Sequence, residues 1–158
     1  MVEPLVDQIM QKIDQAAELY HRLLLVVGPS GAGKTSALRA VRKHIEAPLI
    51  NINLELCKRM LDMTERQRML QLPTLIGEII NEAGKNVVLL DNIEILFDIS
   101  LKQEPLRLLQ GISRNRTVVA TWNGFIDSGT LIYAVPEHHE YRRYPVRDFL
   151  IASSDAVS

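Results

Sequence analysis

The residues best suited to chemistry lie in the segment "GPSGAGKT", which runs from Gly28 to Thr35. It fits the phosphate-binding pattern G-x-x-x-x-G-K-[ST], and it lies between an expected strand and an expected helix, as that pattern requires. Its glycines let the backbone curl so that N–H groups point at phosphate oxygens, while the following helix offers its positive end. The alternative is a glycine turn with a solvated lysine. We expect a nucleotide to bind here, contacted by Gly28, Pro29, Ser30, Gly31, Ala32, Gly33, Lys34, Thr35 and Ser36.

A carboxylate follows at the end of "VVLLD", an apolar run that predicts a buried strand ending in Asp91. Lys34 is expected to reach the β- and γ-phosphates, and Thr35 to ligate Mg²⁺ through its hydroxyl. Asp91 would hold the Mg²⁺ shell opposite Thr35, as a Walker B carboxylate does. The alternative role for Asp91 is that of a helix N-cap. The cofactors that we expect are therefore ATP and Mg²⁺.

A further strand with a polar end is predicted by "TVVATWNG". Thr121 or Asn123 could contact the γ-phosphate or the attacking water, which is the pattern of a sensor. Alternatively, Thr121 is an ordinary strand residue and Asn123 a turn former.

Strands that alternate with helices must position these residues. Strands are expected at 23–27, 47–53, up to 91, at 117–122 and within "YRRYPVRDFLIAS", and the pattern weakens past Gly124. Helices are expected in an amphipathic stretch at 4–20 whose apolar stripe includes Tyr20, in "TSALRAVRKHI", at 55–83 with a break near Pro73, and at 94–115 with a break at Pro105. This alternation predicts an α/β, three-layer P-loop fold with a five-stranded, mostly parallel sheet and helices on both faces. We expect one domain over residues 1–158, with an amphipathic helix within 1–22 and the sheet core at 23–152.

The composition is ordinary for a soluble globular protein, with 47% hydrophobic and 23% charged residues. The first residues lack the layout of a secretory signal, and no apolar run approaches the roughly 18 residues of a membrane span, so we expect a cytoplasmic protein. The lone cysteine, Cys57, is expected to be buried or inert. The adjacent histidines of "EHHE" (137–140) point apart and lack spaced partners, which disfavours zinc. A net charge of −1 gives no overall basic field for nucleic acid, although a local basic patch stays open.

The phosphate-binding loop, "VVLLDNIEILFD" and "TVVATWNG" together resemble the additional-strand P-loop ATPases, which include the AAA+ and RecA-like proteins. In these proteins a strand lies between the P-loop strand and the Walker B strand. Over nearly all of its length, through its small size, "LLDNIEILFD" and "LIYAVPEHHEYRRYPVRDFLI", the chain also resembles the BrxF family, small P-loop proteins of type 3 BREX bacteriophage-defence systems. That resemblance implies work in an assembly with a DNA methyltransferase, a large ATPase, a helicase and a phosphatase-like protein.

The residue after Asp91 is unusual for such an ATPase. AAA+ proteins usually have Asp-Glu here, and some carry a second acid where Glu94 lies, so Asn92 occupies the place of the water-activating glutamate. An amide can orient water but cannot accept its proton, and loss of a general base typically costs about 10²–10⁴-fold. Positioning and charge neutralisation remain available, so we expect slow hydrolysis. Glu94 could substitute if the loop turns it inward; otherwise it is a surface acid near a helix amino terminus.

Several arginines are candidates for an arginine finger, a residue from a neighbouring protomer that stabilises transition-state charge. Arg142 and Arg143 lie just before the expected last strand, where AAA+ fingers often occur, and Arg114 and Arg116 precede "TVVATW". Each arginine also fits a surface role in which its stem covers apolar neighbours. The chain ends soon after the fifth expected strand, so we expect no C-terminal lid domain and expect another protomer or a partner to complete the site.

Three functions compete on these grounds. The leading one is an ATP-binding, slowly hydrolysing component of a phage-defence complex, which forms a homo-oligomer or docks on defence proteins such as the large ATPase or the methyltransferase. The second is a small-molecule P-loop kinase, which would place the P-loop strand directly beside the Asp-bearing strand. The third is a non-hydrolysing nucleotide-binding assembly module. The sequence has no guanine-reading N-K-x-D motif, which favours ATP over GTP, and it shows no evident DNA contact.

Overall fold

A computed structural model describes residues 4–29, 31–133 and 142–153. In chain order, its helices and strands are α1 Leu5–Ala16, β1 Leu23–Gly28, α2 Lys34–His44, β2 Leu49–Asn51, α3 Ile52–Arg59, α4 Glu65–Ala83, β3 Val87–Asp91, the 3₁₀ helices η1 Glu94–Phe97 and η2 Ile99–Leu101, α5 Pro105–Ile112, β4 Thr117–Asp127, β5 Thr130–Tyr133, β6 Arg142–Pro145 and β7 Leu150–Ser153. No helix in these described ranges is both long enough and apolar enough to cross a membrane.

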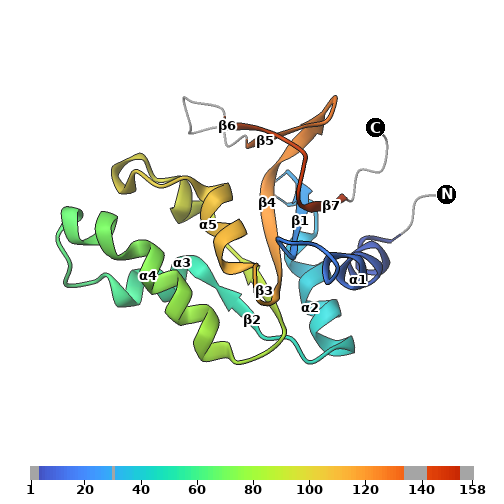
Figure 1. The fold of residues 1–158 in the computed structure, drawn as a ribbon, viewed down its shortest axis with the longest axis horizontal. Coiled ribbons are helices and arrows are strands. Elements are labelled where there is room, and N and C mark those ends of the chain that lie inside the picture. Colours follow the sequence, from blue (N-terminus) through green and yellow to red (C-terminus); the bar gives the residue numbers. More distant parts are fainter. Residues whose placement is uncertain (1–3, 30, 134–141, 154–158) are drawn as a thin grey trace.

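The central sheet is parallel and has the strand order β2-β3-β4-β1-β7. Helices cover both of its faces, so the predicted three-layer α/β fold is confirmed (Figure 1). β4 lies between β1, which leads into the glycine loop, and β3, which ends in Asp91. This is the additional-strand arrangement, and it differs from the neighbouring placement of those two strands that the kinase alternative requires.

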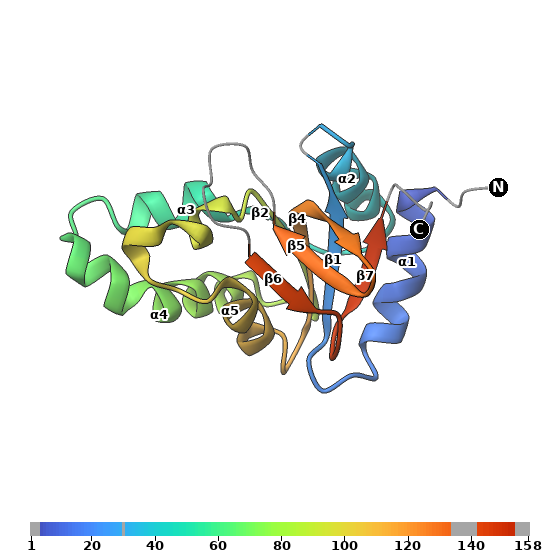
Figure 2. The same ribbon diagram turned by 90° about the horizontal axis from the view of Figure 1, so that it is seen from above.

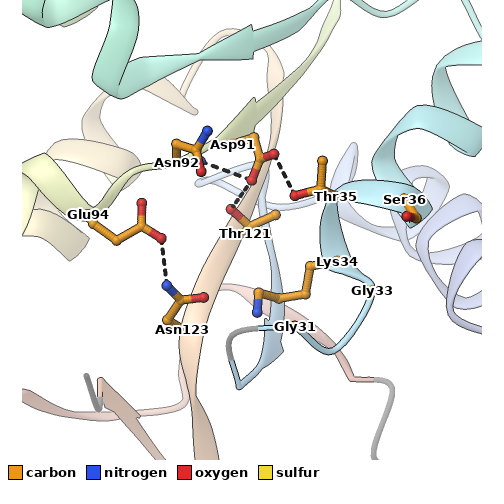
Figure 3. Close-up of a pocket in the computed structure, with 10 residues that line it drawn as sticks. All are labelled: Gly31, Gly33, Lys34, Thr35, Ser36, Asp91, Asn92, Glu94, Thr121 and Asn123. Carbon is orange, nitrogen blue, oxygen red and sulfur yellow. Dashed lines mark hydrogen bonds between the residues drawn. The ribbon is translucent and has the colours of Figure 1, made fainter. Parts of the chain in front are cut away.

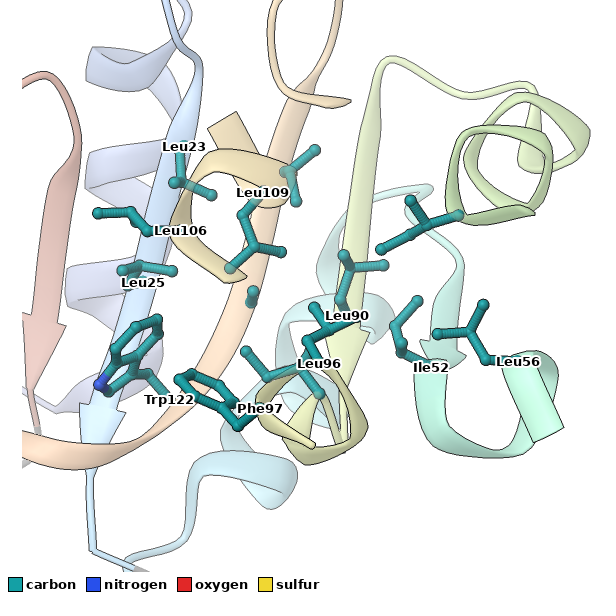
Figure 4. Close-up of a cluster of buried hydrophobic side chains, with 14 of the residues drawn as sticks. Leu23, Leu25, Ile52, Leu56, Leu90, Leu96, Phe97, Leu106, Leu109 and Trp122 are labelled. Atoms are coloured by element: carbon teal, nitrogen blue, oxygen red, sulfur yellow. The ribbon is translucent and has the colours of Figure 1, made fainter. Parts of the chain in front are cut away.

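The core has two parts, one on each face of the sheet. On one face, α1 and α2 pack on alternate residues of β1, such as Leu24 and Val26. On the other face, α3, α4 and α5 pack on the intervening residues, such as Leu23 and Leu25, in the larger cluster (Figure 4). Strands buried on both faces must be apolar at nearly every position, which explains the continuous run of β1.

The end of the sheet differs from the sequence-based expectation. β4 continues as far as Asp127 and pairs with β5, which pairs with β6, and both of these pairings are antiparallel. The sheet therefore has seven strands, where five were predicted. The added strands stand in front of the central sheet in the view from above (Figure 2). The expected fifth parallel strand is β7, at the edge beside β1.

Several element boundaries also differ. The opening helix ends at Ala16, so Tyr20, expected on its buried stripe, is 68% exposed. β2 is shorter than the predicted strand 47–53, because the Asn51 side chain caps α3 by accepting from the backbone N–H of Leu54. Cys57 is exposed on α3, so it is not buried, and its expected inertness stays a prediction.

The predicted break near Pro73 is wrong, since Pro73 lies inside α4. A proline cannot donate to the carbonyl four residues earlier, which here belongs to Met69. The side chain of Gln103 donates to that carbonyl oxygen instead, at 2.8 Å. The real break precedes α4, which begins with a capping box between Thr64 and Gln67.

Candidate nucleotide site

The register of the strands brings the candidate residues together at one edge of the sheet. Leu90 pairs with Ala120, so Asp91 and Thr121 follow at neighbouring positions, and Gly28 pairs directly with Asn123. A pocket of about 330 Å³ opens at this carboxyl edge (Figure 3). It is lined by Gly31, Gly33, Lys34, Thr35, Ser36, Asp91, Asn92, Glu94, Thr121 and Asn123. Ligands of open α/β sheets bind at this edge.

One wall of the pocket is the glycine loop. Gly31 and Gly33 both have a φ of 84°, a left-handed conformation that favours glycine. Gly33 is the N-cap of α2, so this 11-residue helix directs its positive end at the pocket. The two left-handed glycines and the helix N-terminus are features that phosphate-binding loops use. Of the predicted contact residues, Ser30 lies outside the described residues.

Lys34 lies in this wall with only 6% of its surface exposed. Its Nζ donates to the backbone oxygens of Gly28, at 2.9 Å, and Pro29, at 2.6 Å. Burial lowers the pKa of the ammonium, and the nearby carboxylates of Glu94 and Asp91 oppose that shift. The buried cation is therefore placed to gain strongly from an anionic phosphate.

Asp91 is the buried centre of the other wall. Its carboxylate accepts hydrogen bonds from the Thr35 hydroxyl at 2.7 Å, the Thr121 hydroxyl at 3.0 Å and the backbone N–H of Asn92 at 2.9 Å. Carboxylate and hydroxyl oxygens are the hard donors that Mg²⁺ prefers. The contact between Thr35 and Asp91 places the two predicted metal ligands together, so this donor set fits Mg²⁺.

Asn92 and Glu94 differ in their placement. Asn92 is exposed and has a φ of 53°, a left-handed conformation that asparagine tolerates better than glutamate does. Its backbone oxygen accepts from the N–H of Asn53 at 3.0 Å. Glu94 is half-buried, and its Oε1 accepts from Asn123 Nδ2 at 2.6 Å. The loop turns Glu94 into the pocket, as its substitution for a missing base requires.

A comparison with models of protein families matches residues 24–125 to the "ATPase family associated with various cellular activities (AAA)". The chain belongs to the AAA family. That family implies ATP binding and typically Mg²⁺. A search of curated proteins found no significant match. Among solved structures, the chain is similar to that titled "Structure of C. elegans PCH-2", with 19% sequence identity and a TM-score of 0.48. The match covers 81% of this chain but only 40% of the PCH-2 chain.

Three of the candidate arginines, whose side chains the structure describes, lie away from the pocket. Arg116 precedes β4, at the opposite end from the phosphate loop, and donates to the backbone oxygen of Ile80 at 2.9 Å. Arg114 lies at the same end, with its guanidinium 5.0 Å from the ring centroid of Tyr20. Arg143 is exposed on β6, opposite Ile132 of β5. None of these three is among the described residues that line the pocket. Arg142 also belongs to β6, whereas "EHHE" lies outside the described residues.

The buried residues that pack beneath the pocket of this AAA protein were not predicted from the sequence. Trp122, between Thr121 and Asn123, is fully buried and packs against Phe97 of η1. Strand alternation was the available signal: if residues 121 and 123 face the pocket, residue 122 must face the opposite core. What Trp122 would meet there could not be read from the pattern, because the pairing of β5 was not predicted.

Proposed function

We propose that this AAA protein binds ATP with Mg²⁺ and hydrolyses it slowly, as a component of a bacterial phage-defence (BREX) complex. The observation that carries slow hydrolysis is the contrast between Asn92 and Glu94. The amide at position 92 can orient water but cannot take its proton. The carboxylate of Glu94 lines the pocket and can accept a proton, whereas the other carboxylate there, Asp91, is engaged by Thr35 and Thr121.

Some residues of the pocket would bind the nucleotide and Mg²⁺, and others would act on the attacking water. Lys34 and the N–H groups of the loop would hold the phosphates, while Thr35 and Asp91 would hold Mg²⁺, whose charge neutralises the phosphate oxygens. Asn123 orients Glu94 through their hydrogen bond. Because Glu94 lies beyond the usual base position, turnover should be slower than with a glutamate next to Asp91.

The role in phage defence rests on the likeness to the BrxF family. The partners proposed are other copies of the chain and defence proteins such as a large ATPase or a DNA methyltransferase. The proposal does not include a DNA contact, and a DNA-binding measurement would detect one.

Two alternatives remain as competitors. A small-molecule kinase is disfavoured because β4 separates β1 from β3. A non-hydrolysing assembly module is favoured by Asn92 alone. Turnover measurements separate this module from a slow ATPase.

The central experiment measures the mass of the assembly that the protein forms and its ATP turnover in the same samples, with and without tagged candidate partners. We expect nucleotide-dependent association and a slow turnover that Lys34→Ala removes. Turnover equal to that of Lys34→Ala under every condition would favour the non-hydrolysing module. Phosphorylation of a small molecule in place of water would favour the kinase.

We further propose that Arg142 or Arg143 acts on the site of a neighbouring protomer. Both belong to β6, and Arg143 is exposed there. A finger acts on transition-state charge and can be worth about 10³–10⁵-fold. Arg142→Ala or Arg143→Ala should therefore depress turnover while ATP affinity stays nearly unchanged.

Mixing makes this test sharper. A Lys34→Ala protomer cannot bind nucleotide but can still donate its arginine, so adding it to the arginine variant should restore part of the turnover. Arg114→Ala is the matched control, since that residue lies at the far end of β4. A protein that stays monomeric with ATP, and whose turnover neither β6 arginine affects, would exclude the finger.

A further inference from the structure

Trp122 lies at the centre of an aromatic cluster behind the nucleotide pocket. Its ring meets the rings of Phe97, Tyr133 and Tyr144 edge to face, with centroids 5.2, 5.9 and 5.8 Å away. Phe97 and Tyr133 are themselves stacked, at 3.5 Å between centroids. Edge-to-face pairs of this kind are worth about 0.5–1.5 kcal/mol each beyond the area that they bury. The cluster therefore joins β4, η1, β5 and β6 at one point.

Two neighbouring residues of β4 hold η1. Glu94 and Phe97 are the first and last residues of this short 3₁₀ helix, so the position of one is coupled to that of the other. Glu94 accepts from Asn123, and Phe97 packs on Trp122 (Figures 3 and 4). A shift of the Trp122 ring would thus move the helix that carries Glu94.

The β5 strand fixes Trp122 from the other side. The indole Nε1 donates to the backbone oxygen of Ile132 at 3.3 Å. Gly124 lies against the same strand so closely that an added Cβ would overlap the Ile132 oxygen. Only glycine allows β5 to approach here, and that approach keeps the indole bonded to β5.

We propose that Trp122 is a positioning residue for the Glu94–Asn123 pair, and that the β5–β6 hairpin sets its position. A displacement of the hairpin would reach the pocket through the indole, which bonds to β5 and packs on η1. This inference rests on the proposed hydrolysis. It also has a direct readout, because Trp122 is the only tryptophan of the chain.

The first test compares two glycine substitutions. Gly124→Ala pushes β5 away from β4, whereas Gly111→Ala places its Cβ in open space on α5. A misplacement of about 1 Å can cost about 10²-fold in rate. We expect Gly124→Ala to lower kcat about tenfold or more, with one nucleotide bound per chain and an affinity within about threefold of wild type. Gly111→Ala should keep the wild-type kcat.

Trp122→Phe gives a second route should Gly124→Ala fold poorly. It keeps an aromatic ring against Phe97 but removes the N–H donor to Ile132. We expect the same split, in which kcat falls and affinity is kept. Wild-type kcat in both variants would overturn the inference, and so would equal losses of nucleotide stoichiometry and turnover.

A double-mutant cycle tests the route of the effect. In an Asn123→Ala background the pair is already broken, so Gly124→Ala should cause little further loss of kcat. If Gly124→Ala lowers kcat by the same factor in the wild-type and Asn123→Ala backgrounds, the hairpin does not act through the Glu94–Asn123 pair. That result would overturn the inference.

Fluorescence separates a failure of this inference from a failure of the proposed hydrolysis. ATP should change the emission of Trp122 in the wild-type protein, and Asn123→Ala should abolish that change. If this emission pattern is seen but the protein does not hydrolyse ATP, only the proposed hydrolysis is wrong. No emission change at saturating ATP, or an equal change in Asn123→Ala, would overturn the role of Trp122.

Discussion

The two walls of the pocket are built in different ways. The phosphate wall is one continuous segment in which Lys34 donates to oxygens only five and six residues away. In the opposite wall, Asp91 bonds to Thr121 across 30 positions, and Glu94 to Asn123 across 29. The first wall follows from local sequence, whereas the second exists only when β3, η1 and β4 are correctly packed. Substitutions should therefore separate nucleotide binding, set by the first wall, from turnover, set mainly by the second.

The largest effect is expected at Lys34. Lys34→Ala removes the ammonium that would bond the β- and γ-phosphates. Each charge-assisted hydrogen bond is worth about 1.5–3 kcal/mol, so affinity should fall by roughly 10²–10⁴-fold and become undetectable in ordinary calorimetry. Lys43→Ala, on the exposed last turn of α2, is the matched control. Unchanged ATP affinity in Lys34→Ala would refute the assignment of the phosphate wall.

The opposite result is expected at Glu94, where turnover should fall and binding persist. Glu94→Gln can still accept from Asn123 but cannot take a proton, so we expect kcat to fall about 10²-fold. Glu65→Gln, an exposed acid in the first turn of α4, is the control for a surface acid near a helix amino terminus. If both variants turn over ATP at the wild-type rate, Glu94 is a surface acid and the two walls do not divide the work.

The same contrast explains what the sequence could predict. A glycine loop between a strand and a helix is a local pattern, as is an apolar strand ending in Asp91, and both were located correctly. The hydrogen bond between Glu94 and Asn123 was not predicted, because it depends on the register of β4 and on the turn after β3.

The misplaced elements have the same cause. Pro73 was expected to break a helix, but a side chain distant in sequence, Gln103, satisfies the carbonyl that proline leaves without a donor. The β5–β6 hairpin was missed because it is held by pairing with β4 beyond Gly124, where the strand pattern fades. Local patterns predicted the parallel sheet, and tertiary contacts overrode them at these points.

A smaller and more selective effect is expected at Asp91, where the two walls meet. Asp91→Ala should weaken Mg²⁺-ATP binding about tenfold and metal-free ATP binding much less, since the carboxylate serves the metal. The change also leaves the Thr35 and Thr121 hydroxyls without their acceptor, at a cost of about 1–3 kcal/mol in unfolding free energy. Calorimetry with Mg²⁺ and with chelator measures the difference. Equal losses under both conditions would argue against a metal role.

A gain is expected at Asn92. Asn92→Glu restores a carboxylate at the usual base position and should raise turnover several-fold if water is otherwise well placed. The left-handed backbone at this residue opposes glutamate by about 1–2 kcal/mol, which limits the gain. Asn92→Asp is a useful companion, because aspartate tolerates this backbone better. A fast wild-type enzyme that Asn92→Glu slows would overturn our interpretation of "DNIE".

The smallest effect concerns stability and again contrasts the two walls. Burial lowers the pKa of Lys34 below 10.5, although Glu94 and Asp91 in the opposite wall oppose the shift. At neutral pH the folded protein therefore carries an ammonium that is less stable there than in the unfolded chain. As pH rises from the folded pKa of Lys34 toward 10.5, the folded state loses this proton first, so the unfolding free energy of the protein without nucleotide should rise.

Lys34→Met removes the ammonium and should lack this gain. The quantity to measure is the difference in unfolding free energy between wild type and Lys34→Met by chemical denaturation at several pH values up to 10.5. It should shift in favour of wild type as pH rises. Glu94→Gln should enlarge that shift, because it removes a charge that keeps the lysine protonated. A flat difference across the range would mean that solvent reaches the ammonium, and a shift unaffected by Glu94→Gln would mean that the two walls are electrostatically independent.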